Sequence, residues 1–500
     1  MDLPHDYPEN HGLSSQALTH FYAAIEKQSL DVNTFILIQD GCVTSKFARS
    51  PYRLDCPQLL FSLSKSITSL AVGIAWDHSL LSLEDKVISF FQNRLPDPVS
   101  PNLSKMTIHH LLSMNAGHHE DIYAVVAQEE DWVSTFLSLE IEHEPGTHYR
   151  YSTHSTYMLA AILETVTGQN VIDFLMPTLF DPLGIPRPTW ETCPKGMTAG
   201  GMGLSLSTES IAKIGLMLLD QGVYAGKRIL SEQYIRLATS EQSDNRLGAK
   251  RIDSAQGYGY QIHLCRRGCY RGDGGFGQLC FVAPEEKIVI AATSSFESMN
   301  QLQTLLDLIY EHIFDRLDKS DSLAPENRSA LQSQLSKMNN SALPSQSIPS
   351  KMPDIHQHRY ALQPNPSGPR TVAFTQQDTT LTVHFIYRDS KDQLLPFDFT
   401  SPLHATSVFN KDLSICSQEV VTYASWQSHD TLQLTLFYIE TPYVVTYTIV
   451  FHGESINLQF DINVSLNISE YCVTGDLLHD HLIKERSNAD PRNEHRYETR

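Results

Sequence analysis

Hydrophobic and polar residues follow different patterns in different parts of this chain. Between residues 31 and 318, apolar runs such as TFILIQ and KIVIAATS lie near the two ends, and amphipathic runs such as STYMLAAILETVTG lie between them. Alternation with a period of two is typical of strands, whereas apolar residues spaced three and four apart are typical of helices. Strands from both ends with helices between them predict an antiparallel sheet covered by helices, an α+β domain.

The pattern changes after residue 318. A stretch rich in Ser, Asn, Gln and Pro, without sustained apolar periodicity, predicts a linker over residues 319–352. Short alternating runs such as TLTVHFIYR and YVVTYTIVFHG then predict an all-β domain, a sandwich or barrel, over residues 353–471. Residues 472–500 are strongly charged and are predicted to be disordered. We therefore expect a domain at 1–318, a linker, a β domain and a tail.

Composition narrows the classes of partner. The 500 residues carry a formal net charge of -20, which disfavours nucleic acid and anionic membrane surfaces and leaves a small-molecule substrate. The segment MDLPHDYPENHG lacks the basic and apolar regions of a signal peptide, and no apolar run is long enough to span a bilayer, so we predict a cytoplasmic protein. The oligomeric state stays open.

Metal and cofactor signals are weak in this sequence. The eight cysteines are scattered, as expected of free thiols in a reducing compartment. Cys265 and Cys269 form a C-x3-C pair without a second half, and the 22 histidines contain no H-E-x-x-H arrangement. We predict no metal and no cofactor.

Two S-x-x-K matches must be separated by their context. Ser210 and Lys213 lie in an amphipathic run, where Lys213 is expected on the solvated face. Ser62 and Lys65 lie where the extended PQLLF gives way to the apolar ITSLAVGIAW. Residues three apart share a helix face, so the Lys65 amine can reach the Ser62 hydroxyl. Burial and the positive end of the helix dipole both lower the pKa of the lysine, so that it can act as a base. The alternative is a serine that caps a helix beside a solvated lysine.

Two further stretches carry candidate chemistry. Tyr151 and Thr153 precede an apolar helix and can project into one cleft, and a tyrosine beside a cation can act as a general base. The run YRGDGGFGQLCFVAP sets glycines against a buried strand, where a substrate carbonyl can approach the backbone closely. The alternatives are a packed aromatic residue and a hairpin whose glycines serve only its geometry.

The order of these segments resembles the serine β-lactamase and penicillin-binding-protein superfamily, in the class C-like branch that includes esterases and D-aminopeptidases. The carriers of this resemblance are FSLSKSITSLAVGIA, TIHHLLSMNAGH, PGTHYRYST and GGMGLSLSTESIAKIG. It implies a β-lactamase/transpeptidase-like domain with helices on both faces of an antiparallel sheet. The β-rich C-terminal part resembles the accessory domain of some members.

The resemblance also implies roles for individual residues. Ser62 would be the acylated nucleophile, and Lys65 and Tyr151 would share the proton transfers. The backbone N–H groups of Ser62 and Gly275 would form the oxyanion hole, with Gly274 beside it and Thr153 in the place of an amide side chain that contacts substrate.

Two departures from the family pattern change the expected substrate. Thr153 lacks the two-ended amide of asparagine. The third motif of the family begins with a Lys or His that would bind a substrate carboxylate, but here it reads Gly272, Asp273, Gly274. The preceding Arg271 does not replace that cation, because strand alternation points its side chain to the other face of the sheet. We therefore expect a serine hydrolase that cleaves a small ester, amide or lactam, with esters and amides favoured over penicillins. The alternative is a catalytically silent binding or regulatory protein with the same fold.

Overall fold

The computed structural model describes residues 3–318, 325–340, 352–365, 368–388 and 392–479. These residues form two compact units. The first holds the described residues up to 340 together with two short segments from further along the chain, Phe409–Cys416 and Ile439–Pro442. The second holds the rest.

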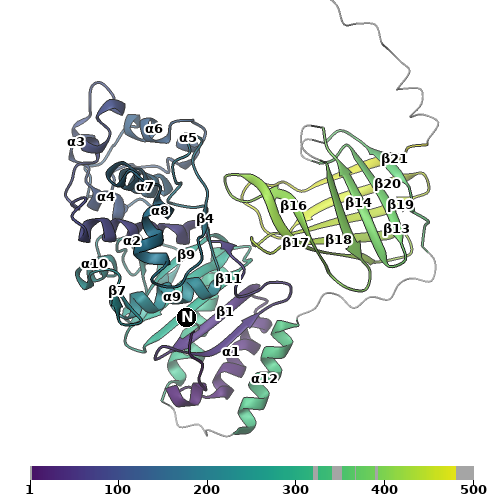
Figure 1. Cartoon of the computed structure of the whole chain (residues 1–500), viewed down its shortest axis with the longest axis horizontal. Coiled ribbons are helices and arrows are strands. Elements are labelled where there is room, and N and C mark those ends of the chain that lie inside the picture. Colours follow the sequence, from purple (N-terminus) through teal and green to yellow (C-terminus); the bar gives the residue numbers. More distant parts are fainter. Residues whose placement is uncertain (1–2, 319–324, 341–351, 366–367, 389–391, 480–500) are drawn as a thin grey trace, which may run out of the picture. The chain divides into compact units, whose positions relative to one another are not determined.

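A six-stranded antiparallel sheet forms the centre of the first unit (Figure 1). Its strands, in spatial order, are β2 (Cys42–Ala48), β1 (Val32–Gln39), β11 (Ile288–Ser294), β10 (Gln278–Ala283), β9 (Tyr270–Gly274) and β8 (His263–Leu264). The first strands of the unit thus pair with its last, as in the register Phe35 to Ala292. The prediction of a sheet built from both ends of this region is confirmed.

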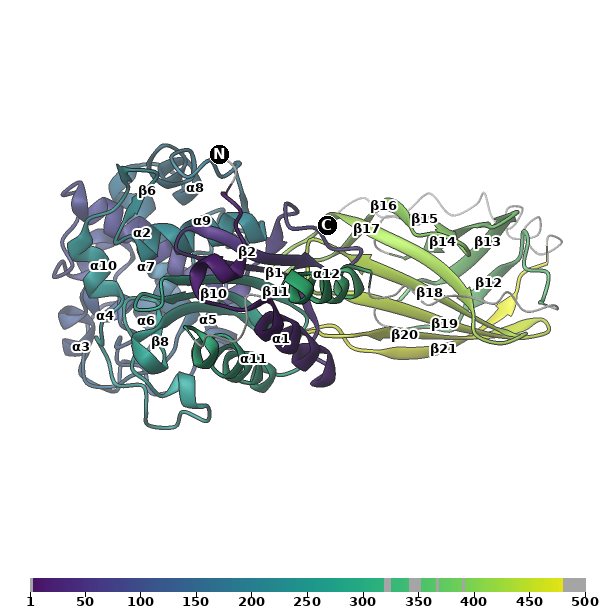
Figure 2. The ribbon, with the colours of Figure 1, turned by 90° about the horizontal axis from the view of Figure 1, so that it is seen from below.

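Helices cover both faces of this sheet (Figure 2). The helices on one face are α1 (Ser15–Lys27), α11 (Met299–His312) and α12 (Pro325–Asn339). Those on the other are α2 (Ser64–Asp77) and α9 (Thr208–Leu219), with α7 (Thr153–Thr167) packed on α2. Alternate residues of β1 supply the two cores: Phe35 and Leu37 face α1, whereas Ile36 and Ile38 face the α2 side.

Short elements complete the first unit beside α2 and α7. The helices are α3 (Pro101–Lys105), α4 (Ile108–Leu112), α5 (Tyr123–Ala127), α6 (Trp132–Ser138), α8 (Val171–Leu175) and α10 (Glu232–Ala238). The strands are β3 (Gln58–Leu59), β4 (Thr189–Trp190), β5 (Leu204–Leu206), β6 (Val223–Tyr224) and β7 (Lys227–Arg228). The family resemblance implied this arrangement of helices and sheet.

The segment predicted to be a linker contains a helix. Residues 325–339 form α12, and Leu331, Leu335 and Met338 are buried in the core that includes α1. These three residues recur at helical spacing, but the Ser, Asn and Gln residues between them hide the pattern. The linker prediction is wrong for this part, and residues 319–324 and 341–351 lie outside the described residues.

The second unit is a ten-stranded antiparallel sheet. Its strands, in spatial order, are β15 (Gln393–Asp398), β14 (Thr380–Ile386), β13 (Thr371–Gln377), β12 (Arg359–Leu362), β21 (Tyr471–Leu477), β20 (Ser455–Ile462), β19 (Val444–His452), β18 (Thr431–Tyr438), β17 (Ile415–Trp426) and β16 (Leu403–Asn410). The two edge strands meet, because Gln393 of β15 donates a hydrogen bond to the carbonyl oxygen of Val408 in β16 at 3.0 Å. The all-β prediction is confirmed as a nearly closed barrel.

The strand β21 corrects the predicted extent of the disordered tail. It continues to Leu477, so the first residues after 471 are ordered in the sheet, while residues 480–500 lie outside the described residues.

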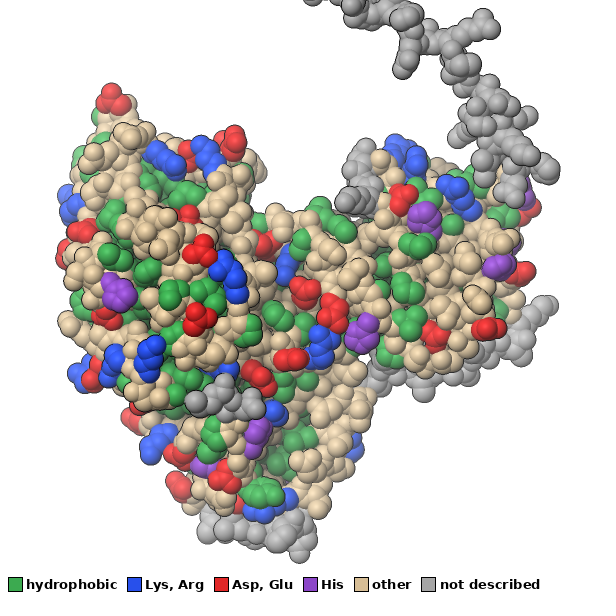
Figure 3. All heavy atoms as spheres, viewed as in Figure 1, with side chains coloured by type: hydrophobic (Ala, Val, Ile, Leu, Met, Phe, Trp, Pro, Cys, Tyr) green, Lys and Arg blue, Asp and Glu red, His purple; other side chains and the backbone are tan. Residues whose placement is uncertain are grey.

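Acidic and basic side chains are interspersed on the face shown in Figure 3. In the described parts of the chain, every helix is too short or too polar to cross a bilayer.

Candidate active site

Ser62 and Lys65 meet at the start of α2. Ser62 lies in a short 3-10 helix, Phe61–Leu63, that leads directly into α2, and Lys65 lies in the first turn. The Lys65 Nζ atom donates hydrogen bonds to the Ser62 Oγ atom at 2.9 Å and to the Gly201 carbonyl oxygen at 2.7 Å. The Lys65 side chain is 1% exposed. The pair predicted from S-x-x-K is therefore a buried contact.

Burial tunes the amine of Lys65. Loss of hydration lowers the pKa of Lys65 to about 7, although the carboxylates of Asp412, Asp273 and Asp121 act in the opposite direction. At neutral pH roughly half of the molecules hold a neutral amine, which can accept a proton. The expectation that desolvation makes this lysine a base agrees with this environment.

Tyr151 completes the group around Ser62. It lies just before α7, whose first N–H groups are capped by the side chain of Ser152. The Ser62 side chain acts on the Tyr151 hydroxyl and lowers its pKa slightly, and the Tyr151 ring centroid lies 5.0 Å from the Lys65 Nζ atom. Burial raises the pKa of Tyr151 well above its ordinary value, so the phenol keeps its proton. This favours proton donation by Tyr151 over the base role expected from the sequence.

The glycine-rich turn lies against the backbone around Ser62. A Cβ atom on Gly274 would lie 2.0 Å from the Leu60 carbonyl oxygen, so only glycine lets β9 approach this closely. Gly274 and Gly275 line, together with Ser62 and Tyr151, a cleft of about 630 Å³. These candidate residues are therefore brought together.

Thr153 lies at the edge of this arrangement. It is the first residue of α7, and its Cγ2 atom would lie 2.8 Å from a Cβ atom on Gly201. It is not among the described residues that line the cleft. Contact between Thr153 and a substrate stays a prediction.

The third motif places no cation on the side that faces α2. Gly272 faces Leu63 and Ser66 there. Arg271 points to the opposite face, is 2% exposed, and donates from Nε to Asp273 at 2.8 Å. Lys250 and Arg251 do line the cleft, on the segment that precedes β8.

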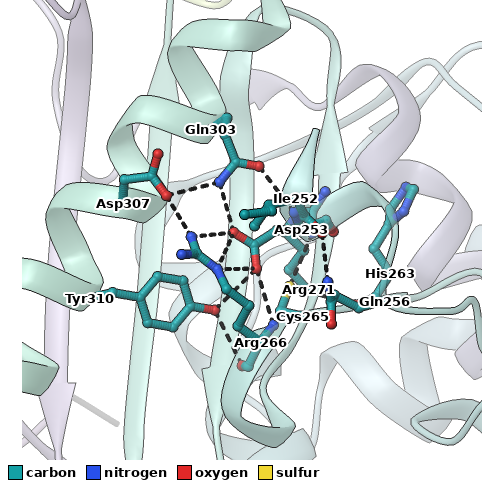
Figure 4. Close-up of polar contacts among 10 residues, drawn as sticks. All are labelled: Ile252, Asp253, Gln256, His263, Cys265, Arg266, Arg271, Gln303, Asp307 and Tyr310. Atoms are coloured by element: carbon teal, nitrogen blue, oxygen red, sulfur yellow. Dashed lines mark hydrogen bonds and ion pairs between the residues drawn. The ribbon is translucent and has the colours of Figure 1, made fainter. Parts of the chain in front are cut away.

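A buried network holds Arg271 in place (Figure 4). Its Nη1 atom donates to the Asp253 carbonyl oxygen at 2.6 Å. The fully buried carboxylate of Asp253 in turn accepts from Arg266 at 2.7 Å and from Gln303 at 2.8 Å. Arg271 is therefore committed to the protein's own acceptors, which leaves it no freedom to bind a substrate carboxylate.

The second S-x-x-K match differs in setting. Ser210 is buried, and its N–H group donates to the Ser207 side chain that caps α9. Lys213 points outward and donates to the Gly184 carbonyl oxygen at 3.0 Å. As predicted, this pair has no catalytic geometry.

Sequence reasoning missed two groups near Ser62 and Lys65. His263 stacks on Tyr151 with ring centroids 6.2 Å apart, and burial lowers its pKa to about 4, so it is neutral. Asp412 interacts electrostatically with Lys65 from about 350 positions away in the sequence. No spacing rule links residues so far apart.

Hydrogen bonds to Glu191 fix the backbone next to Asp412, in the segment Phe409–Cys416. The N–H groups of Leu413 and Ser414 donate to the Glu191 carboxylate at 3.2 and 2.9 Å. The Asp412 Oδ2 atom is buried and has no hydrogen-bond partner among the described residues. Burial and the nearby Glu191 raise the pKa of Asp412 to about 7.

The sheet, the helices on both of its faces and the buried Ser–Lys pair define a β-lactamase/transpeptidase-like protein. The beta-lactamase family model matches residues 33–314, more than half of the chain, and the chain belongs to that family. It is 23% identical over 288 residues to the 6-aminohexanoate-dimer hydrolase of Paenarthrobacter ureafaciens, covering 53% of this chain and 72% of the relative. It is 27% identical over 165 residues to the D-aminopeptidase of Brucella anthropi, covering 30% of this chain and 31% of the relative.

A solved structure extends the likeness beyond the residues that the family model matches. The octameric penicillin-binding protein homologue from Pyrococcus abyssi matches 92% of this chain and 99% of its own, with a TM-score of 0.50 and 14% identity. At this identity the likeness shows the fold alone. The two named relatives are hydrolases, and together with the family match this supports a hydrolase function here.

Proposed function

We propose that this protein is a serine hydrolase that forms an acyl-enzyme on Ser62. The observation that carries the proposal is the 2.9 Å contact between the Ser62 hydroxyl and the buried amine of Lys65, whose pKa is lowered to about 7. A neutral amine at this distance accepts the hydroxyl proton as the oxygen attacks a substrate carbonyl carbon.

The remaining groups account for the other steps. The carbonyl oxygen becomes an oxyanion, which the N–H groups of Ser62 and Gly275 would stabilise. Tyr151 donates its phenolic proton to the leaving alkoxide or amine, and the proton held by Lys65 restores it. Water then attacks the acyl carbon, Lys65 accepts a proton from that water, and the bond to the Ser62 Oγ atom breaks as Lys65 returns the proton to it and the acid product leaves.

The acidic residues near Lys65 favour, as substrates, esters or amides that carry a free amine. Asp121 lines the cleft, Asp121 and Asp412 both act on Lys65, and the buried Oδ2 atom of Asp412 has no hydrogen-bond partner among the described residues. A buried carboxylate oxygen is costly unless a donor reaches it, and a substrate ammonium group would be such a donor. The two named relatives are a 6-aminohexanoate-dimer hydrolase and a D-aminopeptidase, and both names are compatible with this choice.

Paired substrates test this proposal. We expect D-alanine p-nitroanilide to be cleaved with a higher kcat/KM than its N-acetyl derivative, and nitrocefin to be a poor substrate. Ser62→Ala should abolish turnover, whereas Ser210→Ala, which alters the second S-x-x-K, should not. Asp412→Asn should reduce the preference for the free amine, and the exposed Asp181→Asn should not change it.

Two outcomes would count against the proposal in different ways. Equal rates on the paired substrates, with turnover still dependent on Ser62, would exclude the amine preference and leave the hydrolase. Absence of turnover and of any acyl adduct would instead favour a binding protein that has kept the fold.

A further inference from the structure

Three histidines gather beside the segment that leads to Tyr151. His119, His143 and His148 each offer a ring nitrogen, and these three atoms lie within 4.8 Å of one another. The His119 Nδ1 and His143 Nε2 atoms are 2.9 Å apart. His119 is exposed and the other two are half-buried, so the cluster is reachable from solvent.

The ring positions are close to those of a metal site. In a tetrahedral zinc site with Zn–N bonds of about 2.0–2.1 Å, donor nitrogens lie about 3.4 Å apart and imidazole centroids about 5 Å apart. The centroid of His119 lies 5.1 Å from that of His143 and 5.5 Å from that of His148. The His143 and His148 rings stack at 4.1 Å, so they must open by about 1 Å to share an ion.

Hydrogen bonds already hold the segment that carries His119 next to the segment that carries His143 and His148. The His143 N–H group donates to the Gly117 carbonyl oxygen at 2.9 Å, and the His119 N–H group donates to the Glu142 carboxylate at 3.1 Å. The Arg150 Nε atom donates to the His119 carbonyl oxygen at 2.7 Å. Little chain entropy remains to be lost when an ion binds, because both segments are already fixed.

A carboxylate lies beside the cluster, on the ring of His119. The Glu120 carboxylate lies 3.6 Å from the His119 Nε2 atom, on the ring nitrogen opposite the one that faces His143. A carboxylate in this place orients a ligating imidazole and raises its basicity.

We propose that His119, His143 and His148 form a binding site for one divalent transition-metal ion, Zn²⁺ by ligand chemistry, with the fourth position open to solvent. Imidazole nitrogens suit Zn²⁺, Ni²⁺ and Co²⁺, whereas Ca²⁺ and Mg²⁺ prefer oxygen ligands. The ion would join the segment after α4 to the segment 142–148. That segment continues into Tyr149 and Tyr151, so the ion would also brace one wall of the catalytic cleft.

Metal titration of the full chain, made without a histidine tag, tests the site. We expect one Zn²⁺ per chain by calorimetry, and with Co²⁺ the ligand-field absorption of a nitrogen and oxygen site without thiolate charge transfer. Loss of an outer-shell partner weakens metal binding about 10–100-fold, so His143→Ala and His148→Ala should each weaken it at least that much. His429→Ala, at an exposed histidine of the other unit, is the matched control and should bind as the unaltered protein does.

Thermal unfolding gives a readout that does not depend on activity. Zn²⁺ should raise the Tm of the unaltered protein and of His429→Ala, and leave the Tm of His143→Ala unchanged. Circular dichroism of the metal-free variants establishes that each is folded. Undiminished Zn²⁺ binding by folded His143→Ala and His148→Ala, or the absence of Zn²⁺ and Co²⁺ binding by the unaltered chain, would overturn the proposal.

Discussion

Replacing Lys65 by methionine should make the protein inactive but, near neutral pH, more stable. Methionine keeps most of the length of the side chain and removes the charge. One pKa unit corresponds to 1.36 kcal/mol, so a fall in the pKa of Lys65 from 10.5 to about 7 means that burying the ammonium form costs about 5 kcal/mol.

The sign of the pH dependence follows from proton linkage. Between pH 7 and 10.5 the unfolded chain holds the Lys65 proton more often than the folded one, so this residue's penalty shrinks as pH rises. The penalty is complete below pH 7. It is about 4 kcal/mol at pH 7, where half of the folded molecules are protonated, and about 1 kcal/mol at pH 10.

Methionine also has a cost that does not depend on pH. The Gly201 carbonyl oxygen loses its donor, which costs about 1–3 kcal/mol for a buried acceptor. We therefore expect Lys65→Met to be more stable than the unaltered protein by about 1–3 kcal/mol at pH 7. Between pH 7 and pH 10 the difference in unfolding free energy should shift by about 3 kcal/mol toward the unaltered protein.

Urea unfolding followed by tryptophan fluorescence measures this difference. Trp76, Trp132 and Trp190 lie in the first unit and Trp426 in the second, so a Trp426→Phe background makes the signal report on the first unit. Titrating groups that do not interact with Lys65 cancel between the two variants, and an Asp412→Asn background removes the contribution of Asp412, which does interact with it. A free-energy difference that stays constant from pH 7 to pH 10 would refute a lowered pKa at Lys65.

Three further outcomes follow from the same site. The rate of acylation of Ser62 should rise as pH increases through about 7, because the neutral form of Lys65 is the base; a rate independent of pH from 5 to 9 would contradict that role. Tyr151→Phe should slow acylation about 10²–10⁴-fold, and an unchanged single-turnover rate would exclude Tyr151 from proton transfer. Gly274→Ala should lower both Tm and activity, because its Cβ atom would lie 2.0 Å from the Leu60 carbonyl oxygen. Gly275→Ala is the control and should keep the Tm of the unaltered protein, because the atom nearest to its Cβ lies at 3.4 Å. Equal Tm values for the two variants would contradict the steric argument.

Local patterns in the sequence predicted much of the fold and the contact between Ser62 and Lys65. Strand alternation and helical spacing predicted the sheet from both ends of the first unit and the β domain after it, since these depend on neighbouring residues. Ser62 and Lys65 could be paired because three residues of helix bring their side chains together. The helix α12 escaped notice because only Leu331, Leu335 and Met338 mark its buried face.

Groups brought in by tertiary structure could not be found in this way. Asp412 acts on Lys65 through a hairpin segment far along the chain, and no local pattern encodes that approach. His143 and His148 have a spacing found in zinc sites, but His119 lies 24 residues before His143 and no local pattern links it to that pair. The raised pKa of Tyr151 reflects burial by residues from several elements, so its protonation state had to come from the structure.

Intact-mass measurement of the acyl-enzyme tests the central claim most directly. After incubation with a p-nitrophenyl ester or a fluorophosphonate, we expect one adduct per chain, mapped by peptide analysis to Ser62. The adduct should be absent from Ser62→Ala and present in Ser210→Ala. An adduct on another residue, or no adduct on the folded protein with any of these reagents, would contradict Ser62 as the nucleophile.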